Sequence, residues 1–164
     1  MEDRNKNDLK QENYREQMVR LKRAIDQQFY LEAIFIEYSI MEDRTEAILR
    51  HAKEWEKYEA KQKGKGRYPT IESKIKKIMD LAREKKSPLH RYFGDQTLNN
   101  VLQWKDQRNT LIHALLKQNL QTEDLLELAQ NGQELAKLLR NRVNDYKRAL
   151  ARLTKRNIQI KETI

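Results

Sequence analysis

The sequence contains no cysteine, only four glycines and two prolines, and no long apolar run. The absence of cysteine excludes disulfides, thiolate metal sites and cysteine nucleophiles. So few glycines and prolines leave little material for the tight turns of a sheet protein. No apolar stretch approaches the roughly 18 residues of a membrane span, and residues 1–10 lack the apolar region of a signal peptide. We therefore expect a soluble, cytoplasmic protein of long helices with no membrane contact.

Charge is abundant and unbalanced. Charged residues make up 36% of the 164 residues, and 34 lysines and arginines against 25 acidic residues give a formal net charge of +9. Hydrophobic residues make up 38%, which is enough for the core of one ordinary domain. A cationic excess favours polyanions such as RNA, because phosphate contacts release counterions. Charged helix faces that only contact solvent explain the same composition, and this alternative stays open.

Apolar residues recur with helical spacing along the chain. The first four predicted helices cover residues 8–28, 29–58, 70–85 and 96–117. A last helix is expected from Thr122, with a heptad pattern that continues to Leu153. Thr70 is expected to cap the third helix, and residues 89–95 are expected to form a turn. We therefore predict one domain over residues 1–164, an all-α up-down bundle of four to five helices.

Two segments concentrate positive charge. Residues 59–69 combine two glycines, one proline and four cations, which predicts a flexible basic loop. Residues 140–164 hold eight cations and two acids, which predicts a basic end of the last helix. If RNA is the ligand, its backbone is expected to contact the cations of the loop, although solvated surface explains them equally well. These four cations are Lys61, Lys63, Lys65 and Arg67.

The fourth predicted helix carries a cation among apolar residues. Its apolar arc comprises Leu98, Val101, Leu102, Trp104, Leu111, Ile112, Leu115 and Leu116. Arg108 falls near the middle of this arc, and Asn109 and His113 follow one turn apart on one face. A cation there is costly unless an acid neutralises it or the arc opens into a cleft or an interface. An ion pair with Glu37 of the second helix, near Arg44, and an open cleft both stay open.

Arginine and histidine together suit one kind of chemistry. Histidine titrates near neutral pH and can transfer protons. Arginine presents a forked, permanently charged set of donors that matches phosphate oxygens. The pair therefore suits metal-independent phosphodiester cleavage, in which the 2′-hydroxyl of RNA is the nucleophile.

The segment from Arg108-Asn109 to His113 resembles the signature of HEPN (higher eukaryotes and prokaryotes nucleotide-binding) domains. The resemblance implies a homodimeric all-α bundle that binds RNA and acts as a metal-independent endoribonuclease of the toxin or defence type. It implies that His113 transfers a proton, that Arg108 stabilises the charged phosphate and that Asn109 orients it, leaving a 2′,3′-cyclic phosphate. It also implies no metal or other cofactor, and an antitoxin or nucleotidyltransferase as a partner. Glu37 and Arg44 on the neighbouring helix are expected to support the motif by orienting Arg108 or extending the anion site, although a coincidence of their i,i+7 spacing explains them equally well.

The sequence lacks the complete motifs of three other kinds of site, namely zinc sites, phosphate-binding loops and paired acidic magnesium sites. No His-Glu-x-x-His motif and no Gly-rich phosphate loop occurs, and Glu56 and Glu59 form only half of a paired acidic magnesium motif. The main alternative is a non-catalytic homodimeric adaptor or a module that binds nucleic acid or nucleotides, with Tyr146 at an interface. The surroundings of Arg108 distinguish the alternatives, because an ion pair with Glu37 needs no ligand.

Overall fold

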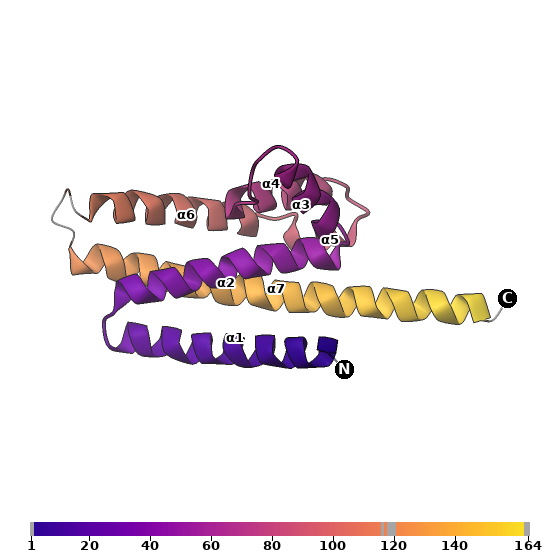
Figure 1. Cartoon of the computed structure of the whole chain (residues 1–164), viewed down its shortest axis with the longest axis horizontal. Helices are drawn as coiled ribbons and strands as arrows, with labels where there is room; N and C mark the ends of the chain where they lie inside the picture. Colours follow the sequence, from indigo (N-terminus) through magenta and orange to yellow (C-terminus); the bar gives the residue numbers. More distant parts are fainter. Residues whose placement is uncertain (1, 116, 118–120, 163–164) are drawn as a thin grey trace. The chain divides into compact units, whose positions relative to one another are not determined.

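The structure is a computed structural model that describes the backbone of residues 2–115, 117 and 121–162, shown in Figure 1. Side chains are described for residues 8–115, 117, 121–156, 158 and 159. The described residues form seven α-helices and no strand, which confirms the all-α prediction but exceeds the four or five helices expected. These helices are α1 (Glu2–Asp26), α2 (Tyr30–His51), α3 (Trp55–Lys63), α4 (Ile71–Ala82), α5 (Pro88–Phe93), α6 (Thr97–Ala114) and α7 (Thr122–Glu162).

The backbone contacts divide the chain into two compact units. Unit 1 comprises Met1–Ser39 and Trp104–Gln133, and unit 2 comprises Ile40–Gln103 and Glu134–Ile164. Helices α2, α6 and α7 contribute residues to both units. The single domain expected over residues 1–164 stays a prediction.

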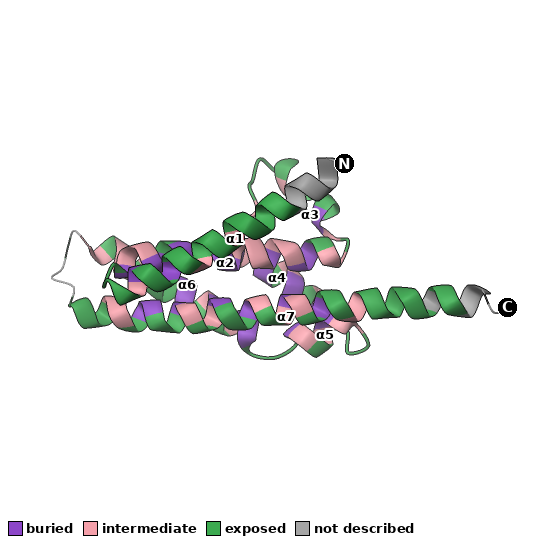
Figure 2. Ribbon diagram, turned by 90° about the horizontal axis from the view of Figure 1, so that it is seen from below, coloured by how far each residue is buried: buried purple, intermediate pink, exposed green. Residues whose placement is uncertain are grey.

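In unit 1, a tight turn joins α1 to α2. Gln28 has a φ of 63°, and the N–H groups of Phe29 and Gln28 donate to the carbonyls of Ala24 and Ile25 at 2.7 and 3.1 Å. This pattern is the Schellman motif, here with glutamine instead of glycine in the left-handed position. Figure 2 shows α1 largely exposed, in agreement with its charged sequence. The buried apolar residues of unit 1 are Leu21, Ala24, Tyr30, Ala33, Ile34, Ile36, Trp104, Leu128 and Ala129.

In unit 2, the predicted second helix is interrupted. Lys53 has a φ of 58°, and the N–H of Glu54 donates to the carbonyl of Leu49 at 2.9 Å, so that the chain turns after α2. A new helix, α3, begins at Trp55, and the prediction of one helix over residues 29–58 is therefore wrong. Because α3 continues to Lys63, the first five residues of the predicted loop at 59–69 are also helical.

The other helix boundaries of unit 2 agree better with the sequence. Thr70 caps α4, since its hydroxyl accepts from the N–H of Ser73 at 3.2 Å and the Ser73 hydroxyl accepts from the N–H of Thr70 at 2.9 Å. Ser87 caps the short helix α5, which replaces the turn expected at residues 89–95. That prediction is wrong because Pro88 begins this helix after Ser87 instead of breaking the chain.

Helix α5 and the second half of α7 share an aromatic cluster in unit 2. Tyr146 is 3% exposed and packs against Tyr92 and Phe93, with ring centroids 5.9 and 5.7 Å away. Arg142 donates to the carbonyl of Tyr92 at 2.9 Å and forms an ion pair with Asp95 at 2.6 Å. Tyr146 is therefore a core residue, and its assignment to an interface between protein copies is wrong.

Helix α7 is continuous through Gly132. Residues 151–156, 158 and 159 of its basic end are exposed, as Figure 2 shows, whereas residues 163 and 164 lie outside the described residues. Within the part of the chain that the structure describes, none of the helices combines the length and apolar character required to cross a bilayer.

Candidate functional site

Helix α6 presents the predicted site from a partly buried face. Trp104 is 2% exposed in unit 1, and its indole Nε1 donates to the carbonyl of Leu128 at 2.9 Å, which attaches α6 to α7. Past this anchor burial decreases: Leu111, Ile112 and Leu115 are half-buried, and Leu116 lies outside the described residues. The site therefore lies where the apolar arc of α6 approaches the surface.

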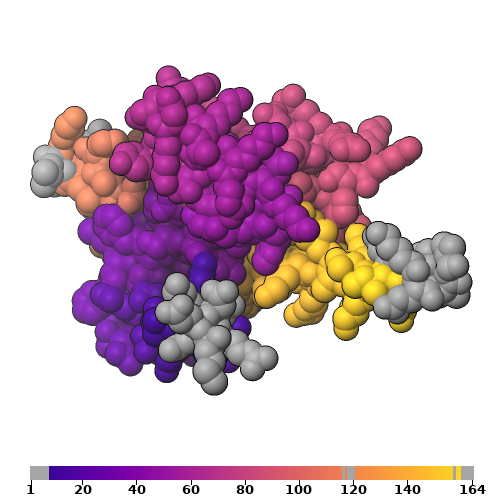
Figure 3. All heavy atoms as spheres, turned by 45° about the vertical axis from the view of Figure 1, so that its right-hand side comes forward, coloured from indigo at the N-terminus to yellow at the C-terminus, as the bar shows by residue number. Residues whose placement is uncertain are grey.

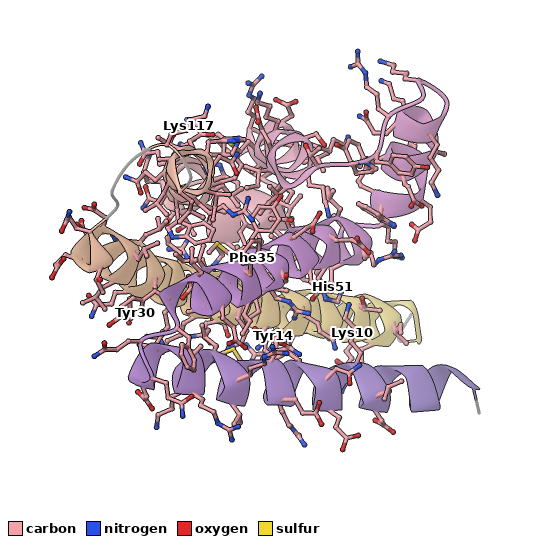
Figure 4. All side chains as sticks on the ribbon, turned by 60° about the vertical axis from the view of Figure 1, so that its left-hand side comes forward. Lys10, Tyr14, Tyr30, Phe35, His51 and Lys117 are labelled. Atoms are coloured by element: carbon pink, nitrogen blue, oxygen red, sulfur yellow. The ribbon has the colours of Figure 1, made fainter. Side chains whose placement is uncertain are left out.

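The guanidinium of Arg108 lies over two aromatic rings of α2. Its Cζ is 4.8 Å from the ring centroid of Tyr38 and 5.0 Å from that of Phe35. Figure 4 shows Phe35 on α2, and this ring is 51% exposed although it packs under a cation. Nη1 of Arg108 donates to Oδ1 of Asn109 at 3.1 Å, and the buried Nε has no hydrogen-bond partner among the described residues. The rings and one amide therefore orient a half-buried cation.

The ion pair between Glu37 and Arg108 does not form. Among the described residues, neither carboxyl oxygen of Glu37 has a hydrogen-bond partner, and the side chain is 0% exposed. Burial raises the pKa of Glu37 to about 9, so that its carboxyl group is protonated at neutral pH. A neutral carboxyl group cannot compensate the charge of Arg108.

Glu37 occupies the space that Gly132 leaves on α7. A Cβ atom at position 132 would clash with the carboxyl group of Glu37 and would lie 2.7 Å from Cζ2 of Trp104. This close approach within unit 1 therefore requires glycine at position 132. Its complete burial places Glu37 on the core-facing side of α2.

His113 is exposed and lies away from Arg108 on the same helix. Five residues correspond to about 7.5 Å along a helix axis and about 140° around it. Asn109 is only about 40° from His113 on this wheel, and it also contacts Arg108. Arg108 and Asn109 are therefore brought together, whereas His113 lies more than one turn further along α6 and is exposed to solvent.

The remaining predicted site residues lie in unit 2. Arg44 forms an ion pair with Asp43 beside it in the sequence. All four loop cations are exposed, and Lys63 forms an ion pair with Glu59 at 3.0 Å. The supporting role of Arg44 and the RNA contacts of all four loop cations stay predictions.

Sequence reasoning missed the two rings that hold Arg108. Phe35 and Tyr38 are three residues apart on α2 and therefore face one direction, which is the available signal in the sequence. Phe35 is strongly exposed for an aromatic residue next to a core, and this is visible only in the structure. Across the described residues, no group of three or more histidine, aspartate or glutamate side chains could hold a metal ion.

Comparison of the chain with protein-family models, curated proteins and solved structures finds no match.

Proposed function

We propose that the protein is a HEPN-like RNA-binding protein and a metal-independent endoribonuclease. The observation that carries this proposal is the state of Arg108: it is half-buried, held by two rings and Asn109, and no described acidic side chain forms an ion pair with it. A half-buried cation without a counter-charge is costly in the free protein. Binding of an anion such as an RNA phosphate would compensate it.

Each residue of the motif has a role in this proposal. The rings of Phe35 and Tyr38 hold the guanidinium, and its Nη N–H groups that do not contact Asn109 are the donors proposed for phosphate oxygens. Asn109 contacts Arg108 and shares a helix face with His113, so that it can orient the bound phosphate. His113 is exposed and can exchange protons with the 2′-hydroxyl or with the leaving oxygen. Attack by the 2′-oxygen would leave a 2′,3′-cyclic phosphate.

The angular separation of Arg108 and His113 favours a site built by two copies. On one helix the two side chains leave the axis about 140° apart. A second copy that supplied its own motif across a two-fold axis would surround the phosphate from the opposite side. We therefore propose a homodimer, and we retain an antitoxin or a nucleotidyltransferase as a proposed partner that restrains it.

A non-catalytic binding module is the second candidate. The observation that favours it is again the position of His113, which faces solvent while Arg108 faces the rings of α2. Arg108 and Asn109 alone can bind a phosphate without any proton transfer. In this case the protein binds RNA or a nucleotide but leaves it intact.

Incubation of RNA with purified protein in EDTA tests the proposal. We expect the wild type to produce 2′,3′-cyclic phosphate ends, His113→Ala to bind RNA but cleave at least 100-fold more slowly, and Arg108→Ala to lose both properties. Gln107→Ala is the matched control, because this neighbouring side chain is exposed and lies outside the motif. Equal cleavage by wild type and His113→Ala would contradict the enzymatic function. Arg108-dependent binding without cleavage by any variant would support the second candidate.

A further inference from the structure

Tyr68 is the most exposed of the large hydrophobic residues that the structure describes. Its side chain is 84% exposed, against 61% for Val19 and 56% for Phe29. Tyr68 lies in unit 2 between α3 and α4, a region that appears in magenta on the face shown in Figure 3. A single exposed aromatic residue is common on protein surfaces, and the surroundings of Tyr68 therefore decide what it can do.

The backbone on both sides of Tyr68 is constrained. The N–H of Arg67 donates to the carbonyl of Gln62 at 3.0 Å, and the N–H of Gly66 donates to that of Lys63 at 2.9 Å. Gly66 has a φ of 65°, so these bonds form a Schellman motif that ends α3 with glycine in the left-handed position. Pro69 follows and restricts Tyr68 to extended conformations. The ring is therefore presented to solvent by a defined turn and not by a long flexible loop.

Cations surround this ring in the sequence, without acids. Residues 60–71 contain four cations and no aspartate or glutamate. Lys61, Lys65 and Arg67 are exposed, and among the described residues none of the three forms an ion pair. The segment thus combines one accessible π-face with uncompensated positive charge.

We propose that Tyr68 is a stacking platform for an unpaired base of single-stranded RNA, with Lys65 and Arg67 binding the adjacent phosphates. Every base has a π-face that can stack on an exposed tyrosine, and neighbouring cations neutralise the backbone. The inference rests on the proposed function only in taking RNA as the ligand, because it concerns binding and requires no cleavage. It adds the substrate class, namely RNA with unpaired bases.

The chemistry of the segment favours single strands over other polyanions. In a duplex the bases are stacked on one another, so that Tyr68 would gain nothing from them. A membrane surface would require several apolar side chains to insert, whereas Tyr68 and Pro69 are the only large apolar residues of the segment 61–70. An acidic protein would use the cations but not the exposed ring.

Binding measurements in the His113→Ala background test the inference without degradation of the RNA. Fluorescence anisotropy with a labelled single-stranded 12-nucleotide RNA should give a Kd about tenfold higher for Tyr68→Ala, and unchanged for Tyr68→Phe. An abasic oligonucleotide with the same backbone should bind wild type and Tyr68→Ala equally. Phe29→Ala is the control for an exposed aromatic residue, and unchanged circular dichroism spectra would show that each variant is folded.

The charge contribution has a separate measurement. The double variant Lys65→Gln/Arg67→Gln should reduce the slope of log Kd against log salt by about 1.4 for single-stranded RNA. The matched control is Lys85→Gln/Lys86→Gln, which removes two exposed cations from the segment after α4. An unchanged slope in the first variant, or an equal decrease in the control, would overturn the assignment of these phosphate contacts.

The two proposals fail in different ways. Equal Kd values for Tyr68→Ala and Tyr68→Phe, or equal effects on single-stranded and duplex RNA, would overturn the stacking platform even if the wild type cleaves RNA. Absence of cleavage, with a tenfold effect of Tyr68→Ala on binding, would support the platform while the endoribonuclease proposal fails.

Discussion

Two buried charged residues, Lys74 of unit 2 and Glu37 of unit 1, differ in whether other side chains compensate them. In unit 2, Lys74 is 3% exposed and is compensated: its Nζ lies 3.3 Å from Glu42 and 3.8 Å from Glu46, and 5.5 Å from the ring centroid of Trp55. In unit 1, Glu37 is 0% exposed, and neither of its carboxyl oxygens has a hydrogen-bond partner among the described residues. Lys74 is therefore surrounded by partners, and Glu37, within the described part of the chain, is not.

The difference separates a structural ion pair from a functional candidate. A buried charge that is fully paired can be explained by folding alone. Unpaired buried groups are costly, and they concentrate at sites where stability is sacrificed for a ligand or a reaction. Unit 1 holds two such groups, the protonated Glu37 and the half-buried Arg108 without an acidic partner. These two groups favour the proposed site around Arg108 in unit 1.

The largest expected effect is that of Glu37→Gln at alkaline pH. The pKa of Glu37 is raised from 4.5 to about 9 by burial, so that between these pH values the folded state holds a proton that the unfolded state has lost. The stability of the wild type should therefore fall with rising pH by up to about 1.4 kcal/mol per pH unit between pH 5 and 9, and this term should be constant above pH 9. Glutamine does not titrate.

Urea unfolding of both proteins from pH 5 to 9 measures this difference. We expect similar free energies of unfolding at pH 5, and a growing advantage of Glu37→Gln that reaches several kcal/mol at pH 9. The other titrating groups are common to both proteins and cancel in the difference. A constant difference across this range would mean that folding does not raise the pKa of Glu37, and the contrast with Lys74 would disappear.

The next effect concerns the space that Glu37 occupies. Gly132→Ala places a Cβ against the carboxyl group of Glu37 and 2.7 Å from a ring carbon of Trp104. Overpacking typically costs about 1–3 kcal/mol, and the higher helix propensity of alanine offsets about 1 kcal/mol. We expect a net loss of about 1–2 kcal/mol in thermal or urea unfolding.

A second glycine provides the control for this prediction. The nearest atom to a Cβ at Gly64 is the carbonyl oxygen of Ala60 at 3.4 Å, so Gly64→Ala should not lower the stability. In a Glu37→Ala background, Gly132→Ala should cost about 1 kcal/mol less than in the wild type, because one of its two obstacles is removed. Equal costs in both backgrounds would show that Glu37 does not fill this space.

Much of the helical fold follows from local sequence, but its interruptions do not. The capping box at Thr70 and Ser73 and the heptads of α7 are local signals, and the structure confirms both. The break at Lys53 has no glycine or proline to announce it, because the left-handed conformation there is adopted by a lysine. The sequence pattern therefore predicted one helix where the chain forms two.

The candidate site was also predictable only in part, because the sequence shows the pattern within one helix but not the contacts between helices. The helical wheel identified Arg108 as a cation on an apolar face, and the structure shows it half-buried. Its partners Phe35 and Tyr38 lie about 70 residues earlier, and spacing within one helix cannot reveal a contact between two helices. The same limit left the ion pair with Glu37 open, and its absence required the positions of both side chains.

A smaller effect on stability is expected from removing the charge of Lys74, which Glu42 and Glu46 compensate. Lys74→Met keeps the aliphatic stem against Trp55 but removes the partner of Glu42 and Glu46, whose side chains are 40% and 28% exposed. Because water can solvate these acids, the loss should be about 1 kcal/mol and not the larger penalty of a fully buried pair. Lys76→Met is the control, since its ion pair with Glu72 is exposed. A more stable Lys74→Met protein would mean that the ion pairs of Lys74 with Glu42 and Glu46 lower the stability of the fold, as the burial of Glu37 does.

The smallest effect on stability should come from Arg108→Met, which removes the uncompensated cation of unit 1. The variant loses the contacts with the rings of Phe35 and Tyr38, each worth about 0.5–1 kcal/mol, but it also removes a half-buried charge that no described acid pairs with. These contributions oppose one another, and the free energy of unfolding should change by less than about 1 kcal/mol. Urea unfolding of the variant measures the effect of Arg108 on stability, and RNA binding of the same preparation measures its effect on the proposed function. A stability loss above that of Lys74→Met would make Arg108 a structural residue, whereas unchanged stability with lost RNA binding would show that its charge is kept for an anion.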